Sequence, residues 1–204
     1  MDYALAAAAA TNSLTDVIVT SDSAEVLARA ALYPHFHCIP RPAALSTSTS
    51  PAIAYVRHAL AHMAGLGKSG YAAVVIVQPT SPFTLPEDVD ATVALLNDPA
   101  ADSAASVMEI PHDLNPLKFK TIAENGLLQP YYDDEAGRTA AHDMPKVFVR
   151  NGSVYAARIA TIEAGKIIGD HCRGHLMPRE RSLDINDEFD WRLAEFMLAN
   201  QNQL

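Results

Sequence analysis

The sequence has little cysteine and little basic charge, and both shortages exclude whole classes of protein. Its two cysteines, Cys38 and Cys172, are far apart with no CxxC spacing, which argues against a disulfide framework and against a structural zinc site. Lysine and arginine number 15 against 24 aspartates and glutamates, so the formal net charge is -9. Because nucleic-acid binding needs a basic surface, this balance predicts that the chain has no nucleic-acid partner.

Long apolar runs are also missing. The alanine run at residues 6–10 is too short to cross a bilayer, and it lacks the basic start of a signal peptide. We therefore expect no membrane association and a cytoplasmic location, whose reducing conditions suit two unpaired thiols. With 204 residues, 49% of them hydrophobic, the chain is long enough to form a single domain, residues 1–204, around a substantial core.

Strand-like and helix-like stretches alternate along the chain. Residues 74–77, VVIV, form an unbroken and mostly β-branched run, which is typical of a strand buried on both faces of a sheet. The other expected strands are 16–20, 38–42, 103–110 and 147–156, and the expected helices are 2–11, 24–32, 52–64, 87–96 and 189–198. This alternation predicts an α/β fold of three layers, Rossmann-like, with a mostly parallel sheet.

The segment 111–145 differs in kind from the rest of the chain. It is rich in proline, asparagine, aspartate and glycine and has few long apolar runs. Such a composition favours turns over packed elements. We expect short strands and loops that reach away from the sheet.

Polar residues directly after the VVIV strand form the first candidate site. Gln78, Thr80 and Ser81 follow the strand's carboxyl end, and Pro79 and Pro82 prevent the strand from continuing. Ligands bind at this edge of open α/β sheets, so the amide and the two hydroxyls are candidate ligand contacts. The alternative is an ordinary strand-to-helix turn in which Thr80 or Ser81 caps the next helix.

A second candidate site lies in the motif SLDIN at 182–186. Asp184 and Asn186 are two residues apart, so in an extended segment both side chains point the same way, as two ligands of one Mg²⁺ ion must. Asparagine offers a neutral carbonyl oxygen, so this pair should bind the ion more weakly than two carboxylates. The alternative is that Asp184 and Asp187 cap the last helix.

Three motifs occur in one order, namely QPTSP at 78–82, RNGSVY at 150–155 and SLDINDEFDW at 182–191. Together they resemble the acylneuraminate cytidylyltransferases, enzymes that make CMP-activated sialic acids and related sugar acids. The resemblance runs from about residue 3 to residue 198. It implies the nucleotide-diphospho-sugar transferase fold, CTP and a sugar acid as substrates, Mg²⁺ as cofactor, and a homodimer in which the region around 111–145 serves as a dimerisation or lid region.

The resemblance also implies roles for individual residues. The QPTSP residues match contacts to the sugar acid, and Lys118 in NPLK matches a lysine near the sugar acid or a phosphate. Arg41 matches a residue at the base or sugar pocket. The implied substrate-binding residues are Gln78, Thr80, Ser81, Arg41, Arg150, Asn151 and Gly152, the implied catalytic residues are Asp184 and Lys118, and the implied metal ligands are Asp184 and Asn186. For Lys118 the alternative is an ordinary surface lysine.

The chain departs from the family pattern in several places. The family holds the triphosphate with a basic, glycine-rich loop after its first strand, whereas residues 1–10 here are similar to the helix that follows that loop. We therefore expect that the sequence begins one strand and one loop into the fold. Ser48 and Asn186 stand where the family has acidic residues.

These departures leave two further functions open. One is a catalytically inactive paralogue that acts as a binding or scaffolding subunit. The other is a nucleotidyltransferase for a different sugar acid, such as 3-deoxy-octulosonate.

Overall fold

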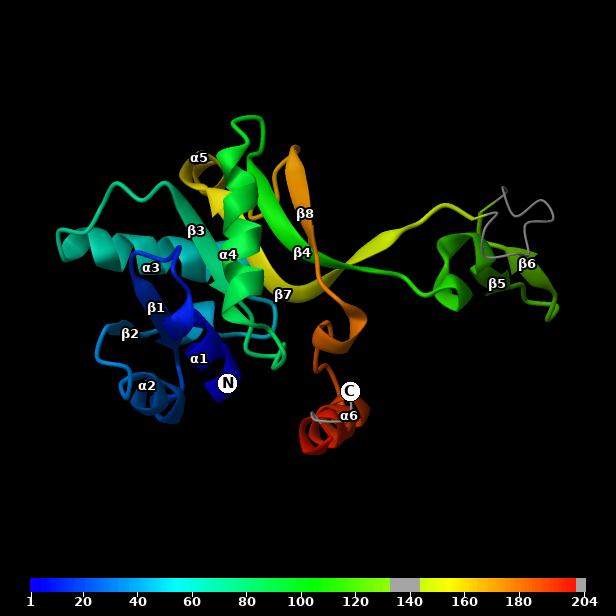
Figure 1. The fold of residues 1–204 in the computed structure, drawn as a ribbon, viewed down its shortest axis with the longest axis horizontal. Helices are drawn as coiled ribbons and strands as arrows, with labels where there is room; N and C mark the ends of the chain where they lie inside the picture. The colour runs from blue at the N-terminus through cyan, green and yellow to red at the C-terminus, as the bar shows by residue number, and fades with distance from the viewer. Residues whose placement is uncertain (133–143, 201–204) are drawn as a thin grey trace.

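The computed structural model describes residues 1–132 and 144–200, and its helices and strands alternate as the sequence predicts (Figure 1). The strands are β1 (Val17–Ser21), β2 (Phe36–Pro40), β3 (Ala73–Val77), β4 (Ser103–Glu109), β5 (Lys120–Ile122), β6 (Leu128–Pro130), β7 (Phe148–Arg158) and β8 (Cys172–Leu176). The helices are α1 (Asp2–Ala10), α2 (Ala24–Ala30), α3 (Ala52–Gly65), α4 (Pro86–Ala94), α5 (Ile159–Glu163) and α6 (Glu188–Ala199). Short 3-10 turns include η2 (Leu95–Asn97), η4 (Pro116–Lys118) and η7 (Arg179–Arg181).

Alternate residues of β3 pack on opposite sides of the sheet, which gives the predicted three layers. Val74 and Ile76 pack in one cluster with residues of α3 and α5. Ala73 and Val75 pack in another with Leu96 of η2. Because side chains of a strand point to opposite faces in turn, both faces of the sheet carry core.

The sheet is mixed, with most strands parallel, as predicted. Hydrogen bonding joins a four-stranded sheet of order β3-β7-β4-β8 and a two-stranded sheet of β1 and β2. Within these two sheets only β7 runs antiparallel to its neighbours, while β1 with β2 and β4 with β8 are parallel pairs. The prediction that VVIV is buried on both faces of a sheet holds in part, because both faces of β3 pack against core clusters, but β3 lies at the edge of the four-stranded sheet and its residues are half-buried.

Strands β1 and β3 begin at the same end of the molecule. The Tyr71 hydroxyl, two residues before β3, donates to Asp16 Oδ2 at 2.8 Å, and Asp16 directly precedes β1. Lys68 donates to the other oxygen of the same carboxylate. These contacts tie the start of β1 to the start of β3.

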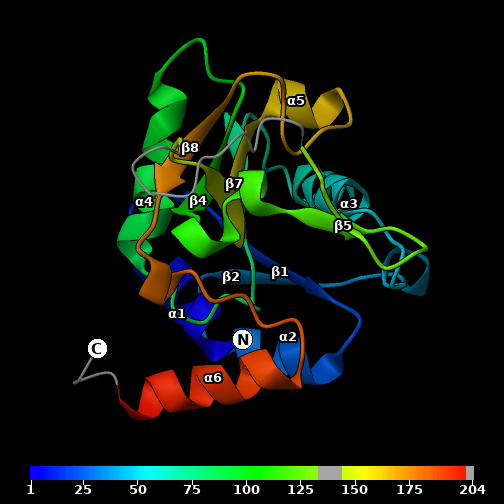
Figure 2. The ribbon, with the colours of Figure 1, turned by 90° about the vertical axis from the view of Figure 1, so that its right-hand side faces the viewer.

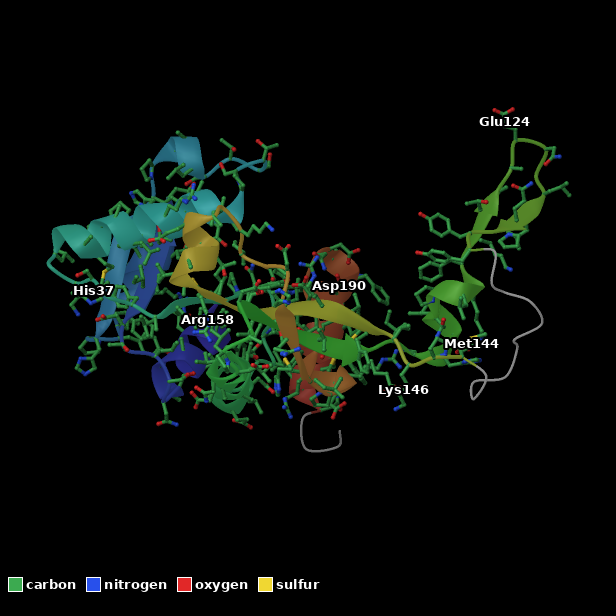
Figure 3. The ribbon with its side chains drawn as sticks, turned by 90° about the horizontal axis from the view of Figure 1, so that it is seen from above. His37, Glu124, Met144, Lys146, Arg158 and Asp190 are labelled. Carbon is green, nitrogen blue, oxygen red and sulfur yellow. The ribbon has the colours of Figure 1, made fainter. Side chains whose placement is uncertain are left out.

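A projecting arm, residues 111–132, extends away from the sheet (Figures 1 and 3). It carries η4 and the antiparallel pair β5 and β6, in which Ile122 lies opposite Leu128. The prediction of short strands and loops that reach outward is confirmed for these residues, whereas residues 133–143 of the predicted region lie outside the described part of the chain. Exposed apolar side chains on the arm are Leu114, Phe119, Ile122, Leu127, Leu128, Tyr131 and Tyr132.

Helix α6 closes the described chain and lies below the rest of the ribbon in both side views (Figures 1 and 2). Its N-terminus is capped by Asp187, whose side chain accepts a hydrogen bond from the Asp190 amide at 3.0 Å. Within residues 1–132 and 144–200, no helix has the length and apolar character that crossing a membrane requires.

Candidate functional site

Three segments that are far apart in the sequence meet just beyond the carboxyl end of β3. The Gln78 amide donates to the Ser153 carbonyl of β7 at 3.0 Å, and the Ile185 amide donates to the Thr80 carbonyl at 2.9 Å. The structure thus brings together parts of the three motifs that the sequence singled out. We call this meeting point of QPTSP, RNGSVY and SLDIN the motif junction.

Gly152 is the residue that allows the Asp184 carboxylate to approach β7. Its φ of 79° is in the left-handed region, where glycine is free of strain. A Cβ atom built at this position would lie 3.0 Å from Asp184 Oδ2 and 3.1 Å from its Cγ. A side chain at position 152 would therefore displace the carboxylate.

Buried polar atoms without partners gather at the motif junction. Asp184 Oδ1, Ser81 Oγ and Ser153 Oγ are each buried and have no hydrogen-bond partner among the described residues. Such atoms are rare in folded proteins, because an unpaired buried polar group costs about 1–3 kcal/mol. Three of the six such atoms in the described part of the chain thus belong to the three motifs, which is what a site completed by a ligand, ion or water would show.

The capping alternatives do not hold for Thr80, Ser81 and Asp184, whereas Asp187 does cap the last helix. At the start of α4 the Asp88 side chain accepts from the Leu85 amide at 3.0 Å, and neither Thr80 nor Ser81 caps this helix. At α6 the cap is Asp187 rather than Asp184. Asp184 is therefore free of a helix-capping role.

The donor set around Asp184 suits a magnesium ion. Among the described residues there is no cluster of three or more histidine, cysteine, aspartate or glutamate side chains. A Mg²⁺ ion that takes part in phosphate chemistry does not need three such side chains. One or two carboxylates, together with waters and substrate phosphates, complete its six ligands. Asn186 lies beside Asp184, with its amide nitrogen 3.3 Å from Oδ2, and a rotated amide would present its oxygen there instead.

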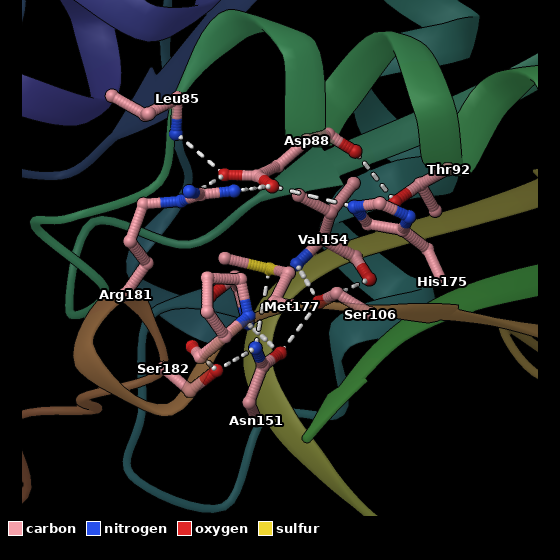
Figure 4. Close-up of polar contacts among 12 residues, drawn as sticks. Leu85, Asp88, Thr92, Ser106, Asn151, Val154, His175, Met177, Arg181 and Ser182 are labelled. Carbon is pink, nitrogen blue, oxygen red and sulfur yellow. Dashed lines mark hydrogen bonds and ion pairs between the residues drawn. The ribbon is translucent and has the colours of Figure 1, made fainter. Parts of the chain in front are cut away.

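The buried side chain of Asn151, next to Gly152, links three other residues of the interior (Figure 4). Its side-chain oxygen accepts from the Ser106 hydroxyl at 2.6 Å, and its nitrogen donates to the Ser182 hydroxyl at 2.9 Å and to Met177 Sδ at 3.2 Å. The side chain is thus engaged inside the protein, and its contact with substrate stays a prediction. Ser106 also accepts from the Val154 amide at 2.9 Å, which fixes β7 beside β4.

A second polar cluster surrounds Asp88 in the first turn of α4 (Figure 4). The Arg181 guanidinium donates to both carboxylate oxygens, at 2.7 and 3.2 Å, and His175 Nε2 lies 3.3 Å from Oδ1. Burial alone would raise the pKa of Asp88, but the hydrogen bonds from Arg181, the Leu85 amide and His175 outweigh it and lower that pKa. The carboxylate is therefore charged and paired at neutral pH.

The structure does not bring all of the predicted site residues to the motif junction. Arg41 follows β2, where its guanidinium lies 5.2 Å from the centre of the Tyr55 ring and 3.9 Å from Asp22. Lys118 lies on the arm, with its Nζ 2.8 Å from His112 Nε2. Arg150 is exposed near the start of β7, where the strand leaves the arm.

Curated relatives identify the kind of protein that this chain resembles. It is 23% identical to the N-acylneuraminate cytidylyltransferase of Escherichia coli O18:K1:H7 (strain RS218 / NMEC) over 202 residues, which is 98% of this chain and 46% of that protein. The chain resembles this enzyme along nearly all of its length. It is also 30% identical over 121 residues to N-acylneuraminate cytidylyltransferase A of Danio rerio, covering 58% of this chain and 27% of that protein. The resemblance drawn from the three motifs is therefore confirmed.

The chain spans less than half the length of these curated relatives. No protein-family model matches it. What it shares with the relatives is thus a sequence resemblance over a part of each of them.

Solved structures confirm the fold. The structure of CMP:2-keto-3-deoxy-manno-octonic acid synthetase complexed with CTP superposes with a TM-score of 0.65 at 13% identity, over 98% of this chain and 87% of that one. A 4-diphosphocytidyl-2C-methyl-D-erythritol synthase gives a TM-score of 0.59 at 14% identity, over 97% and 88%. The α/β body therefore has the fold of these nucleotidyltransferases.

The sequence analysis did not predict the buried residues whose hydrogen bonds hold the segments next to the site. Ser106, Asp88 and Arg181 belong to no motif, and Ser182, although it begins SLDIN, was not singled out. Ser153 stands within RNGSVY but carried no separate signal. Partners separated by 93 residues, such as Asp88 and Arg181, leave no periodic pattern by which a single sequence could reveal them.

Proposed function

We propose that the chain is the catalytic part of a cytidylyltransferase that activates a nonulosonic, sialic-type sugar acid with CTP. The observation that carries this proposal is the motif junction, where Asp184 Oδ1 is buried and unpartnered against Gly152 in a chain that resembles acylneuraminate cytidylyltransferases. In the reaction, the anomeric hydroxyl of the sugar acid forms a bond to the α-phosphorus of CTP. The bond from that phosphorus to the bridging oxygen of the β-phosphate breaks, pyrophosphate leaves, and the hydroxyl proton passes to solvent.

Asp184, assisted by Asn186, would hold a magnesium ion in this reaction. The ion, when bound, would neutralise charge on the triphosphate and on departing pyrophosphate. Gln78 and the hydroxyls of Thr80 and Ser81 would orient the sugar acid beside it, since orientation is the main protein contribution to phosphoryl transfer. Gly152 keeps the space in which the carboxylate lies.

The exposed arm supports a homodimer as part of the proposal. Ile122 and Leu128 are 75% and 65% exposed as a cross-strand pair, and a surface of this kind marks a contact with another chain. Lys118 lies on the same arm, and its side-chain partners among the described residues are His112 and Asp113, both on the arm. In a dimer with two-fold symmetry, the arm would carry Lys118 to the site of the partner subunit.

The proposal keeps the cytoplasm as the location. Both Cys38 and Cys172 are free thiols, and Cys172 is exposed. A reducing compartment preserves exposed thiols.

Pyrophosphate release from CTP tests the activity directly. The assay uses a panel of sialic, legionaminic, pseudaminic and octulosonic acids, with and without magnesium. We expect release with one nonulosonic acid, and we expect Asp184→Ala to abolish it while Asp187→Ala, the helix cap, keeps it. Release with octulosonic acid alone would favour the second substrate class, and a chain that binds no CTP by calorimetry would favour the inactive paralogue.

Mixing two inactive variants tests the shared site. Lys118→Ala and Asp184→Ala each remove one half of the site if Lys118 acts in the partner subunit. After the two proteins are mixed and exchanged, half of the dimers carry one intact site, so about a quarter of the original activity should return. No recovery, despite exchange shown by sedimentation, would place Lys118 outside the site.

A further inference from the structure

We propose that Asp88 is a positioning residue that holds Asp184 in the motif junction by way of Arg181. The inference rests on the proposed function of Asp184. Neither the three motifs nor the resemblance assigns a role to Asp88 or Arg181. Because neither side chain contacts the motif junction directly, the role is one of positioning.

The ion pair of Asp88 and Arg181, which we call the anchor, is held firmly in place. Asp88 is 1% exposed, accepts both hydrogen bonds of the Arg181 fork and also accepts from the Leu85 amide in the first turn of α4. Carboxylates are favoured at a helix N-terminus, and α4 itself packs against β7, β4 and β8. Arg181 is therefore tied to a fixed point of the α/β body rather than to a flexible surface residue.

Arg181 directly precedes SLDIN at 182–186, the motif in which we propose that Asp184 holds a metal ion. Ser182, the next residue, is fixed by the Asn151 side chain at 2.9 Å. The Ile185 amide is fixed by the Thr80 carbonyl at 2.9 Å. Asp184 lies between these two contacts, so the segment that carries it is fastened on both sides, and Arg181 fastens its beginning to α4 (Figure 4).

The charge of Asp88 is what makes the anchor two-pronged. A guanidinium matches a carboxylate with two parallel hydrogen bonds, and an asparagine can accept only through one oxygen. His175 Nε2 also lies 3.3 Å from the same carboxylate, on the side of β8. Loss of the charge would thus release Arg181 and leave its half-buried guanidinium without a full partner.

A second pair of the same chemistry supplies the matched control. Arg173 also donates two hydrogen bonds to a carboxylate, here to the single oxygen Oδ2 of Asp98 at 2.6 and 3.0 Å, but both side chains are more than a third exposed. Neither residue adjoins the segment 182–186. Asp98→Asn removes a carboxylate of this kind without touching the anchor.

The experiment compares Asp88→Asn, Arg181→Gln, their double variant and Asp98→Asn in two measurements. The first is amide exchange at Ile185, read by NMR, with β4 amides as an internal reference. The second is the affinity for Mn²⁺, read by electron paramagnetic resonance, together with the magnesium concentration that gives half-maximal pyrophosphate release. Thermal melting confirms that each variant is folded, and Arg181→Gln serves if Asp88→Asn does not fold.

We expect exchange at Ile185 to accelerate about ten-fold in Asp88→Asn and Arg181→Gln while β4 amides are unchanged. We expect Mn²⁺ affinity to fall about ten-fold, as for other residues that orient a metal ligand, and turnover at saturating magnesium to stay within about two-fold. The double variant should show no larger effect than either single variant, because both remove one contact. Asp98→Asn should change nothing.

Unchanged exchange at Ile185, or an equal change in Asp98→Asn, overturns the proposal. Faster exchange with unaltered Mn²⁺ affinity also overturns it, because the anchor would then not position Asp184 for a metal. A wild-type chain that neither binds Mn²⁺ nor releases pyrophosphate contradicts the proposed function instead. In that case the exchange data alone decide whether Asp88 fixes the segment.

Discussion

The α/β body and the projecting arm differ in the side chains that they bury and expose. In the body, buried polar groups such as Asn151 and Asp88 are surrounded by partners, whereas Ser81, Ser153 and Asp184 at the motif junction keep buried atoms that have no partner among the described residues. On the arm, Ile122 and Leu128 face solvent. A two-stranded pair is marginal on its own, so the arm needs another surface to cover it. The proposed ligand site thus lies in the body, and the proposed contact with a second chain lies on the arm.

The largest expected effect comes from the interior of the body. Asn151→Ala removes the shared partner of Ser106 and Ser182 and should lower the free energy of unfolding by about 3 kcal/mol, because buried hydrogen-bonding groups are left unpaired. Urea unfolding measures it.

Asn115 offers a matched control at the base of the arm. It is also buried, but its side chain bonds only the Leu117 amide and the Pro145 carbonyl among the described residues. Asn115→Ala should cost about 1 kcal/mol. Equal losses in the two variants would contradict the difference that we draw between body and arm.

Acid should weaken the body through Asp88. Burial raises its pKa, but the hydrogen bonds led by Arg181 leave the folded value below the ordinary 3.8. A carboxyl with a lowered pKa contributes stability above its unfolded pKa and loses it as pH falls through the folded pKa. The free energy of unfolding should therefore drop below about pH 4, and Asp88→Asn should flatten this drop. If the free energy of unfolding of Asp88→Asn falls at low pH as it does in the original chain, the pairing of Asp88 with Arg181 is contradicted.

Substitutions on the arm should separate association from folding. The double variant Ile122→Ser and Leu128→Ser changes exposed side chains only, so the free energy of unfolding of the body should change by less than about 0.5 kcal/mol. Sedimentation should nevertheless show a monomer where the original chain is a dimer. A large loss of stability with unchanged association would mean that the pair packs within its own chain.

The smallest effect concerns the start of β1 and β3. Burial, followed by the hydrogen bond to Asp16, raises the pKa of Tyr71 from 10.0 to about 12. The stabilisation from this pair is present below pH 10 and is lost as pH rises through about 12. Ultraviolet titration of the phenolate measures the pKa, and Asp16→Asn should move it back toward the ordinary value. A midpoint near 10 in the original chain would show that the contact is absent in solution.

The sequence alone predicted the alternation of helices and strands, the three layers and the outward reach of the arm. These features depend on apolar periodicity and turn chemistry, which act between residues close in the chain. The motifs also pointed to Gln78, Thr80 and Asp184, because the edge at which strands end follows from the α/β pattern.

Only the tertiary structure decided which of these residues meet. It placed β3 at an edge of its sheet, left Lys118 on the arm, and paired Asp88 with Arg181 across 93 positions. Long-range contacts of this kind depend on strand order and on how the chain crosses between layers. A local pattern specifies that a buried carboxylate needs a partner, but the packing of distant elements chooses the partner.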